Sequence, residues 1–130
     1  MTQELWIAVY AAVLGLFQLT LAAIAPAGQK GYMKWNRSAR DEPFELSPIA
    51  GRLQRAFKNF METYVFFALI AVALSISHKA GPVSLYGAWA YFIARIVYVP
   101  CYAFGIAGVR SLVWIVSLAG LCACAVALLI

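Results

Sequence analysis

Residues 47–77, SPIAGRLQRAFKNFMETYVFFALIAVALSIS, decide the fold, because here a basic segment continues without a break into an apolar one. Ser47 is suited to cap a helix, and Pro48 is suited to its first position, where a missing N–H costs nothing. A helix over residues 48–77 would measure roughly 45 Å, which exceeds the ~30 Å hydrocarbon core of a bilayer. The sequence therefore predicts one long helix whose first turns stand outside the membrane.

Polar residues recur at intervals of three and four in the first half of this helix, namely Arg52, Arg55, Asn59 and Glu62. This spacing places them on one face. A carboxylate at the start of an apolar run is costly against lipid, so Glu62 is expected to face a protein interior or a wet cavity. Either this face lines a polar pocket, or the basic residues reach lipid headgroups while Glu62 forms a structural salt bridge with Arg55 or Lys58.

The composition indicates an integral membrane protein of one domain, because 65% of the 130 residues are apolar and only 12% are charged. The net charge of +5 is concentrated in one loop and its flanks, which is a topology signal and not a sign of nucleic-acid binding. The N-terminus has neither a basic region nor a convincing cleavage site, so we expect its first apolar run to be retained as a span.

The potential metal ligands are few. Cys101, Cys122 and Cys124 lie in apolar stretches, and their spacing from the single histidine, His78, is not that of a metal site. We therefore expect the cysteines to act as small apolar residues, His78 to lie in a solvated turn, and no metal to be bound.

The hydropathy pattern predicts four spans at about residues 5–25, 48–77, 82–104 and 111–130, in an all-α antiparallel four-helix bundle. The loop over residues 28–46 and the start of the next helix carry seven basic residues, whereas the turn near His78 offers only Lys79. The positive-inside rule then places the loop in the cytoplasm and both termini outside. Short loops and the lack of sorting signals favour a bacterial inner membrane.

A second polar stripe lies on the third predicted span, where Arg95, Tyr98 and Tyr102 are three and four residues apart. Counted from the turn, Arg95 lies roughly 20 Å along its helix and Glu62 roughly 22 Å along the preceding one. The same count brings Tyr98 level with Glu62, and Tyr102 near Asn59. We therefore expect two matched stripes that face each other.

Two runs, RLQRAFKNFMETY (52–64) and ARIVYVPCYAFGIAGVRS (94–111), resemble segments of the MAPEG family, the membrane-associated proteins of eicosanoid and glutathione metabolism. The resemblance is strongest over residues 52–114. It implies a four-helix bundle that assembles as a homotrimer and binds glutathione between subunits near the cytoplasmic side. It also implies a hydrophobic second substrate that enters from the bilayer.

The resemblance implies a role for each polar residue. Glu62 would hold the amino group of glutathione, Asn59 and Lys58 would contact its polar arms, and Arg55 would support the pocket. Arg95, Tyr98 and Tyr102 would line the site from the third span. Arg110, with Ser111, would lie near the thiol and stabilise its thiolate, whose reference pKa is about 8.5.

Three functions are compatible with this pattern. The first is a glutathione-dependent transferase or peroxidase that acts on hydrophobic electrophiles or lipid peroxides. The second is a non-catalytic protein of the same fold that binds a lipid or a protein partner, and the two differ in whether Arg110 reaches the pocket or only obeys the topology rule. The third is a small multidrug transporter with proton coupling at Glu62, which is disfavoured because Glu62 lies near one membrane face among basic residues.

Overall fold

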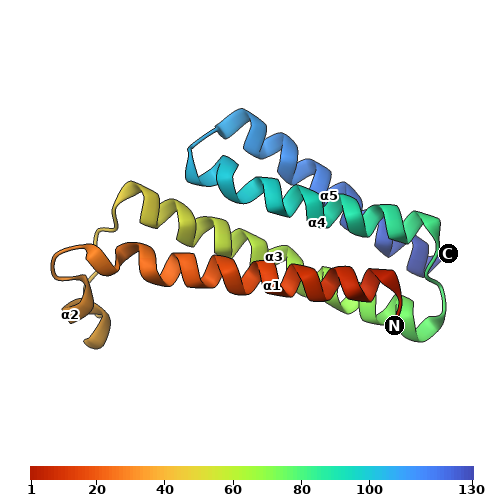
Figure 1. The fold of residues 1–130 in the computed structure, drawn as a ribbon, viewed down its shortest axis with the longest axis horizontal. Helices are drawn as coiled ribbons and strands as arrows, with labels where there is room; N and C mark the ends of the chain where they lie inside the picture. The colour runs from red at the N-terminus through yellow and green to blue at the C-terminus, as the bar shows by residue number, and fades with distance from the viewer.

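The computed structural model describes residues 1–130 and is entirely helical apart from turns and connections. Its elements in chain order are α1 (Gln3–Ile24), the 3₁₀ helix η1 (Ala25–Gly28), α2 (Tyr32–Arg37), α3 (Pro48–Ser77), α4 (Pro82–Ala103) and α5 (Ala107–Leu129). Figure 1 shows the long helices α1, α3, α4 and α5 packed alongside one another, with the short α2 set apart at one end. The prediction of an all-α fold is confirmed.

Three stretches are long and apolar enough to cross a bilayer, namely Gln3–Gly28, Pro48–Ser77 and Ala107–Leu129. Their outward faces carry side chains such as Leu16, Leu69 and Leu112, each 62–68% exposed. Apolar surface of this extent belongs against lipid, so the chain is an integral membrane protein. Helix α4 falls outside this set because Arg95 and four tyrosines make it less apolar.

The two ends of α3 follow the predicted signals. The Ser47 hydroxyl accepts a hydrogen bond from the Ala50 amide at 3.3 Å, and Pro48 occupies the first helical position. The helix ends at the exposed His78, whose φ of 57° is left-handed, while the next amide, that of Lys79, donates to the Leu74 carbonyl. One continuous helix therefore carries the whole first stripe.

The long helices form two pairs, α1 with α3 and α4 with α5 (Figure 1). The closest approach within the second pair is at Gly87 and Gly120. A Cβ atom added to Gly87 would lie 2.7 Å from the Gly120 carbonyl oxygen, and one added to Gly120 would lie 2.5 Å from the Gly87 carbonyl oxygen. Small residues of this kind let membrane helices pack backbone to backbone.

The two pairs are fastened together at the end that holds both chain termini. There Ser84 of α4 donates a hydrogen bond to the carboxylate of Glu4, which is only 3% exposed although the sequence analysis gave this residue no role. Lys79 Nζ donates to the Leu128 carbonyl of α5 at 2.9 Å. From this end the α4–α5 pair diverges from the α1–α3 pair, as Figure 1 shows.

The register between α3 and α4 differs from the one that counting from the turn predicted. Thr63 and Tyr91 share a hydrogen bond of 3.0 Å, and Arg95 contacts Asn59 rather than lying level with Glu62. Thr63 lies 14 residues before the end of α3, but Tyr91 lies only nine after the start of α4 (77−63 and 91−82). The count failed because it assumed that both helices meet the turn at the same depth.

The connection over residues 28–46 has structure of its own. The rings of Tyr32, Trp35 and Phe44 form a cluster with centroid separations of 5.4–5.8 Å. Trp35 Nε1 donates to the Glu42 carbonyl at 2.6 Å. These contacts fold the connection upon itself, and its Tyr32 and Phe44 line one of the two cavities described below, together with residues of α1 and α3.

Candidate functional site

A cavity of about 640 Å³ lies between α3 and the α4–α5 pair, towards the end where the helix pairs diverge. It is lined by Arg55, Lys58, Asn59 and Glu62 from α3, by Tyr98 and Tyr102 from α4, and by Arg110, Ser111, Trp114 and Ile115 from α5. The structure thus brings together eight of the nine residues that the sequence analysis selected. The exception is Arg95. We refer to this cavity as the polar cavity.

The charged groups of the polar cavity are three cations and one carboxylate. Arg55 and Lys58 lie on α3, Arg110 lies on the first turns of α5, and Glu62 provides the negative charge. Three cations and one carboxylate give the lining a formal net charge of +2. A cavity with this balance favours an anionic ligand that also bears one positive group.

Two of the cations meet at Tyr102. Arg55 Nε donates to the Tyr102 hydroxyl at 3.1 Å, and Arg110 Cζ lies 4.7 Å from the centre of the same ring. The salt bridge between Arg55 and Glu62, one of the two interpretations of the sequence, is therefore not the contact that Arg55 makes. Both guanidinium groups contact the same side chain, and an anion bound by both would offset their like charges.

Arg95 does not line the polar cavity but lies behind it, at 1% exposure. Its Nη1 donates to Asn59 Oδ1 at 3.0 Å, and its guanidinium lies 4.3 Å from the centre of the Tyr98 ring. Because the amide oxygen of Asn59 is turned towards Arg95, its NH₂ group is turned away from that guanidinium and is free to donate to a ligand. Asn59 therefore presents donors, which suit a carboxylate or carbonyl oxygen.

Ser111 is exposed, and its hydroxyl donates to the Ala107 carbonyl one turn earlier at 3.2 Å. A hydroxyl has one proton, so this bond must break before Ser111 can donate to a thiolate. Of the two residues expected near the thiol, Arg110 is the one with its charge available. The catalytic role of Ser111 stays a prediction.

Sequence reasoning missed two residues of the lining, Trp114 and Ile115. Both lie on α5 one turn after Arg110 and Ser111, so the helical repeat places them on the same face. That repeat is the signal by which they could have been found. Trp114 and Ile115 are the apolar part of the α5 lining, and Ile115 is 56% exposed.

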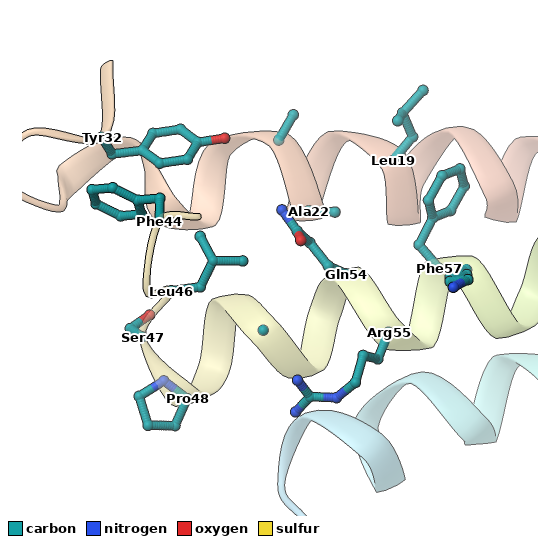
Figure 2. A pocket seen from close by; sticks show the side chains of 13 residues that line it. Leu19, Ala22, Tyr32, Phe44, Leu46, Ser47, Pro48, Gln54, Arg55 and Phe57 are labelled. Atoms are coloured by element: carbon teal, nitrogen blue, oxygen red, sulfur yellow. The ribbon is translucent and has the colours of Figure 1, made fainter. Parts of the chain in front are cut away.

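A second cavity, of about 670 Å³, lies between α1, α3 and the connection that holds Tyr32 and Phe44. Arg55 and Lys58 border both cavities. Figure 2 shows that the guanidinium of Arg55 points away from α1, towards the α4–α5 pair, whereas Gln54 points towards α1. The guanidinium of Arg55 is therefore a group of the polar cavity.

The chain holds no group of three or more His, Cys, Asp or Glu side chains placed to bind a metal ion. Its three cysteines are free thiols, of which Cys101 and Cys124 are buried and Cys122 is exposed. The chemistry of the polar cavity therefore rests on guanidinium, ammonium, amide and hydroxyl groups and one carboxylate.

Long apolar helices and a polar cavity at one end of the bundle define a helical integral membrane protein with a candidate ligand site. The model of the MAPEG family matches residues 7–130, nearly the whole chain, and the protein belongs to this family. The family resemblance recognised in the sequence is thereby confirmed over more of the chain than the two runs that carried it. No curated protein and no solved structure matches the chain.

Proposed function

We propose that the protein is a glutathione-dependent transferase or peroxidase that acts on hydrophobic electrophiles or lipid peroxides. The observation that carries this proposal is the charge balance of the polar cavity. Glutathione with an ionised thiol has three anionic groups, namely two carboxylates and the thiolate, and one ammonium group. The cavity offers three cations and one carboxylate.

Each group of glutathione has a partner of suitable chemistry. Glu62 accepts from the ammonium group, while Arg55, Lys58 and the NH₂ group of Asn59 bind the carboxylates. Arg110 lies on α5, with its Cζ 4.7 Å from the centre of the Tyr102 ring, and pairs with the thiolate. The ligand thereby neutralises the two guanidinium groups that the structure holds against one ring.

Pairing with Arg110 lowers the pKa of the glutathione thiol below its reference value of about 8.5, so that thiolate is present at neutral pH. The thiolate attacks an electrophilic carbon, forms a C–S bond and expels the leaving group. With a hydroperoxide it attacks the terminal oxygen, which breaks the O–O bond, forms a sulfenic acid and expels an alkoxide that takes a proton from water to become the alcohol. A second glutathione then condenses with the sulfenic acid to form the disulfide and water.

The proposal includes an assembly and a membrane orientation. We infer that α4 also crosses the bilayer, which makes four spans, and that three chains associate as a homotrimer. The basic connection over residues 28–46 faces the cytoplasm and both termini lie outside, in a bacterial inner membrane. The polar cavity then opens near the cytoplasmic side, within reach of a soluble peptide, and its α5 edge faces the lipid.

Calorimetric titration of glutathione into the detergent-purified protein tests the proposal. We expect saturable binding that Glu62→Gln and Arg110→Ala each weaken about tenfold or more, as for the loss of a charge-assisted contact. Lys34→Ala is the matched control, because it removes an exposed cation of α2 that lines neither cavity. The control should bind like the wild type.

A second titration and an activity assay complete the test. S-methylglutathione, which has no thiol, should still depend on Glu62 but much less on Arg110. Glutathione-dependent consumption of an aryl halide and of a lipid hydroperoxide measures the two reactions. An intact protein that shows no saturable heat with millimolar glutathione would refute the proposal and favour the non-catalytic role of binding a lipid or a protein partner.

A further inference from the structure

The position of Arg110 depends on the short turn between α4 and α5. Helix α4 ends at Ala103 and α5 begins at Ala107, so Arg110 lies on the first turn of α5, where its amide donates to the Ile106 carbonyl at 3.0 Å. No side chain caps the start of α5. The turn includes Gly105 with φ of 72°, a left-handed conformation that glycine adopts without strain. The amides of Gly105 and Ile106 donate to the Tyr102 and Cys101 carbonyls, which ties the turn to the end of α4 and leaves its distance from α3 to be fixed by other contacts.

A side chain from α3 contacts this turn from outside. Arg52 Nη1 lies 3.4 Å from the carbonyl oxygen of Ala103, the last residue of α4. A Cβ atom at Gly105 would lie 3.5–3.7 Å from the guanidinium of Arg52, which therefore packs directly against the turn. A cation at the C-terminal end of a helix is also attracted to the helix dipole. Arg52 thus ties the start of α3 to the end of α4.

We propose that Arg52 is a positioning residue that holds the α4–α5 turn against α3 and thereby places Arg110 over the polar cavity. Arg52 itself lines neither of the two cavities, so it has no direct contact with a ligand bound there. Arg55 lies one helical turn after Arg52 on α3. It makes the neighbouring contact between α3 and α4, a hydrogen bond to the Tyr102 hydroxyl. The consequence for thiol activation rests on the proposed function, whereas the effect on the turn does not.

Hydrogen exchange on the full-length protein without ligand tests the structural half. Arg52→Ala should speed exchange of the amides in residues 104–111 roughly fivefold, because a charged contact with the helix end is lost. Arg52→Lys retains the charge and should restore part of the protection. Residues 78–84, at the opposite end of α4, should exchange as in the wild type. Unchanged exchange in residues 104–111, or faster exchange throughout the protein, would overturn the inference.

The effect of Arg52 on thiol activation is tested by measuring the pH at which bound glutathione becomes a thiolate. The ultraviolet absorbance of the thiolate reports this change. Arg52→Ala should raise this pH by about one unit, which corresponds to roughly tenfold weaker thiolate stabilisation. Affinity for S-methylglutathione should change by less than about threefold, because Arg52 lines no cavity. A general loss of structure would weaken both ligands together, and that result would contradict a positioning role.

The two failures are distinguishable. Absence of glutathione binding by the wild type would refute the proposed function, while the exchange experiment would still decide whether Arg52 holds the turn. Normal wild-type binding together with an unchanged thiolate pH in Arg52→Ala would refute the positioning role and leave the proposed function intact.

Discussion

Replacing Arg95 by methionine separates the stability of the bundle from the shape of the polar cavity. Arg95 is 1% exposed, yet its Nε and Nη2 atoms have no hydrogen-bond partner. Its one hydrogen bond, from Nη1, goes to Asn59 at 3.0 Å. Methionine is shorter than arginine but similar in volume and uncharged, so Arg95→Met removes the buried cation and keeps the apolar contact of the side-chain stem.

The opposing contributions to stability are similar in size. The lost hydrogen bond from a charged donor contributes about 1.5–3 kcal/mol, and the lost contact with the Tyr98 ring contributes about 0.5–2 kcal/mol. Against this, the native state no longer buries two donor nitrogens without a partner, Nε and Nη2, each of which costs about 1–3 kcal/mol. We therefore expect the melting temperature in detergent to change little.

Glutathione binding should respond differently. Without Arg95, the Asn59 amide is free to turn its oxygen towards the ligand, so calorimetry should show affinity reduced about tenfold, or roughly 1.4 kcal/mol. Asn59→Ala is the matched control and should lose a similar amount. If Arg95 acts through Asn59, the double variant should bind no more weakly than Asn59→Ala alone.

The refuting result is a large loss of stability. Removing one member of a well-compensated buried pair lowers the free energy of unfolding by about 3–5 kcal/mol, and this is the loss that Arg95→Met would then show. Such a loss, with affinity unchanged in the protein that remains folded, would mean that the buried guanidinium stabilises the bundle and does not orient Asn59.

Three further predictions concern single contacts. Gly87→Ala should destabilise the protein by about 1–3 kcal/mol in thermal melting, because its Cβ would lie 2.7 Å from a backbone oxygen of α5; Gly108→Ala, with open space around its Cβ, is the control. Tyr102→Phe removes the hydroxyl that holds Arg55 and should weaken glutathione binding about three- to tenfold in calorimetry, while unchanged affinity would mean that Arg55 needs no such support. Ser111→Ala should leave the rate of glutathione conjugation within about twofold, since this hydroxyl already donates within α5, and a loss of a hundredfold or more would restore its catalytic role.

The sequence predicted the composition of the polar cavity well, because helical periodicity fixes which residues share a face. Arg55, Asn59 and Glu62 all line the cavity from α3, as their spacing of four and three residues required. Tyr98 and Tyr102 do so from α4. The cap at Ser47 was predictable for the same reason, since it depends only on neighbours along the chain.

The contacts between helices were not predictable in the same way. Counting from the turn predicted that Tyr102 lies near Asn59. In the structure the hydroxyl of Tyr102 instead accepts a hydrogen bond from Arg55. The relative depth of two helices depends on how their surfaces interlock, and this involves residues distant in sequence. Burial of Glu4 was missed because its partner, Ser84, lies 80 residues away.

The change in side-chain size along α4 accounts for the position of the polar cavity. Near the α3–α4 turn the buried residues of α4 are small, Ser84 and Ala88, and here the two helix pairs are joined. Further along, Tyr91, Arg95 and Tyr98 are buried and require more space between the helices. The pairs are therefore held together at one end and forced apart at the other, where Figure 1 shows them diverging. On this reasoning the cavity is built into the packing of α4, and a ligand would enter a space that the bundle already provides.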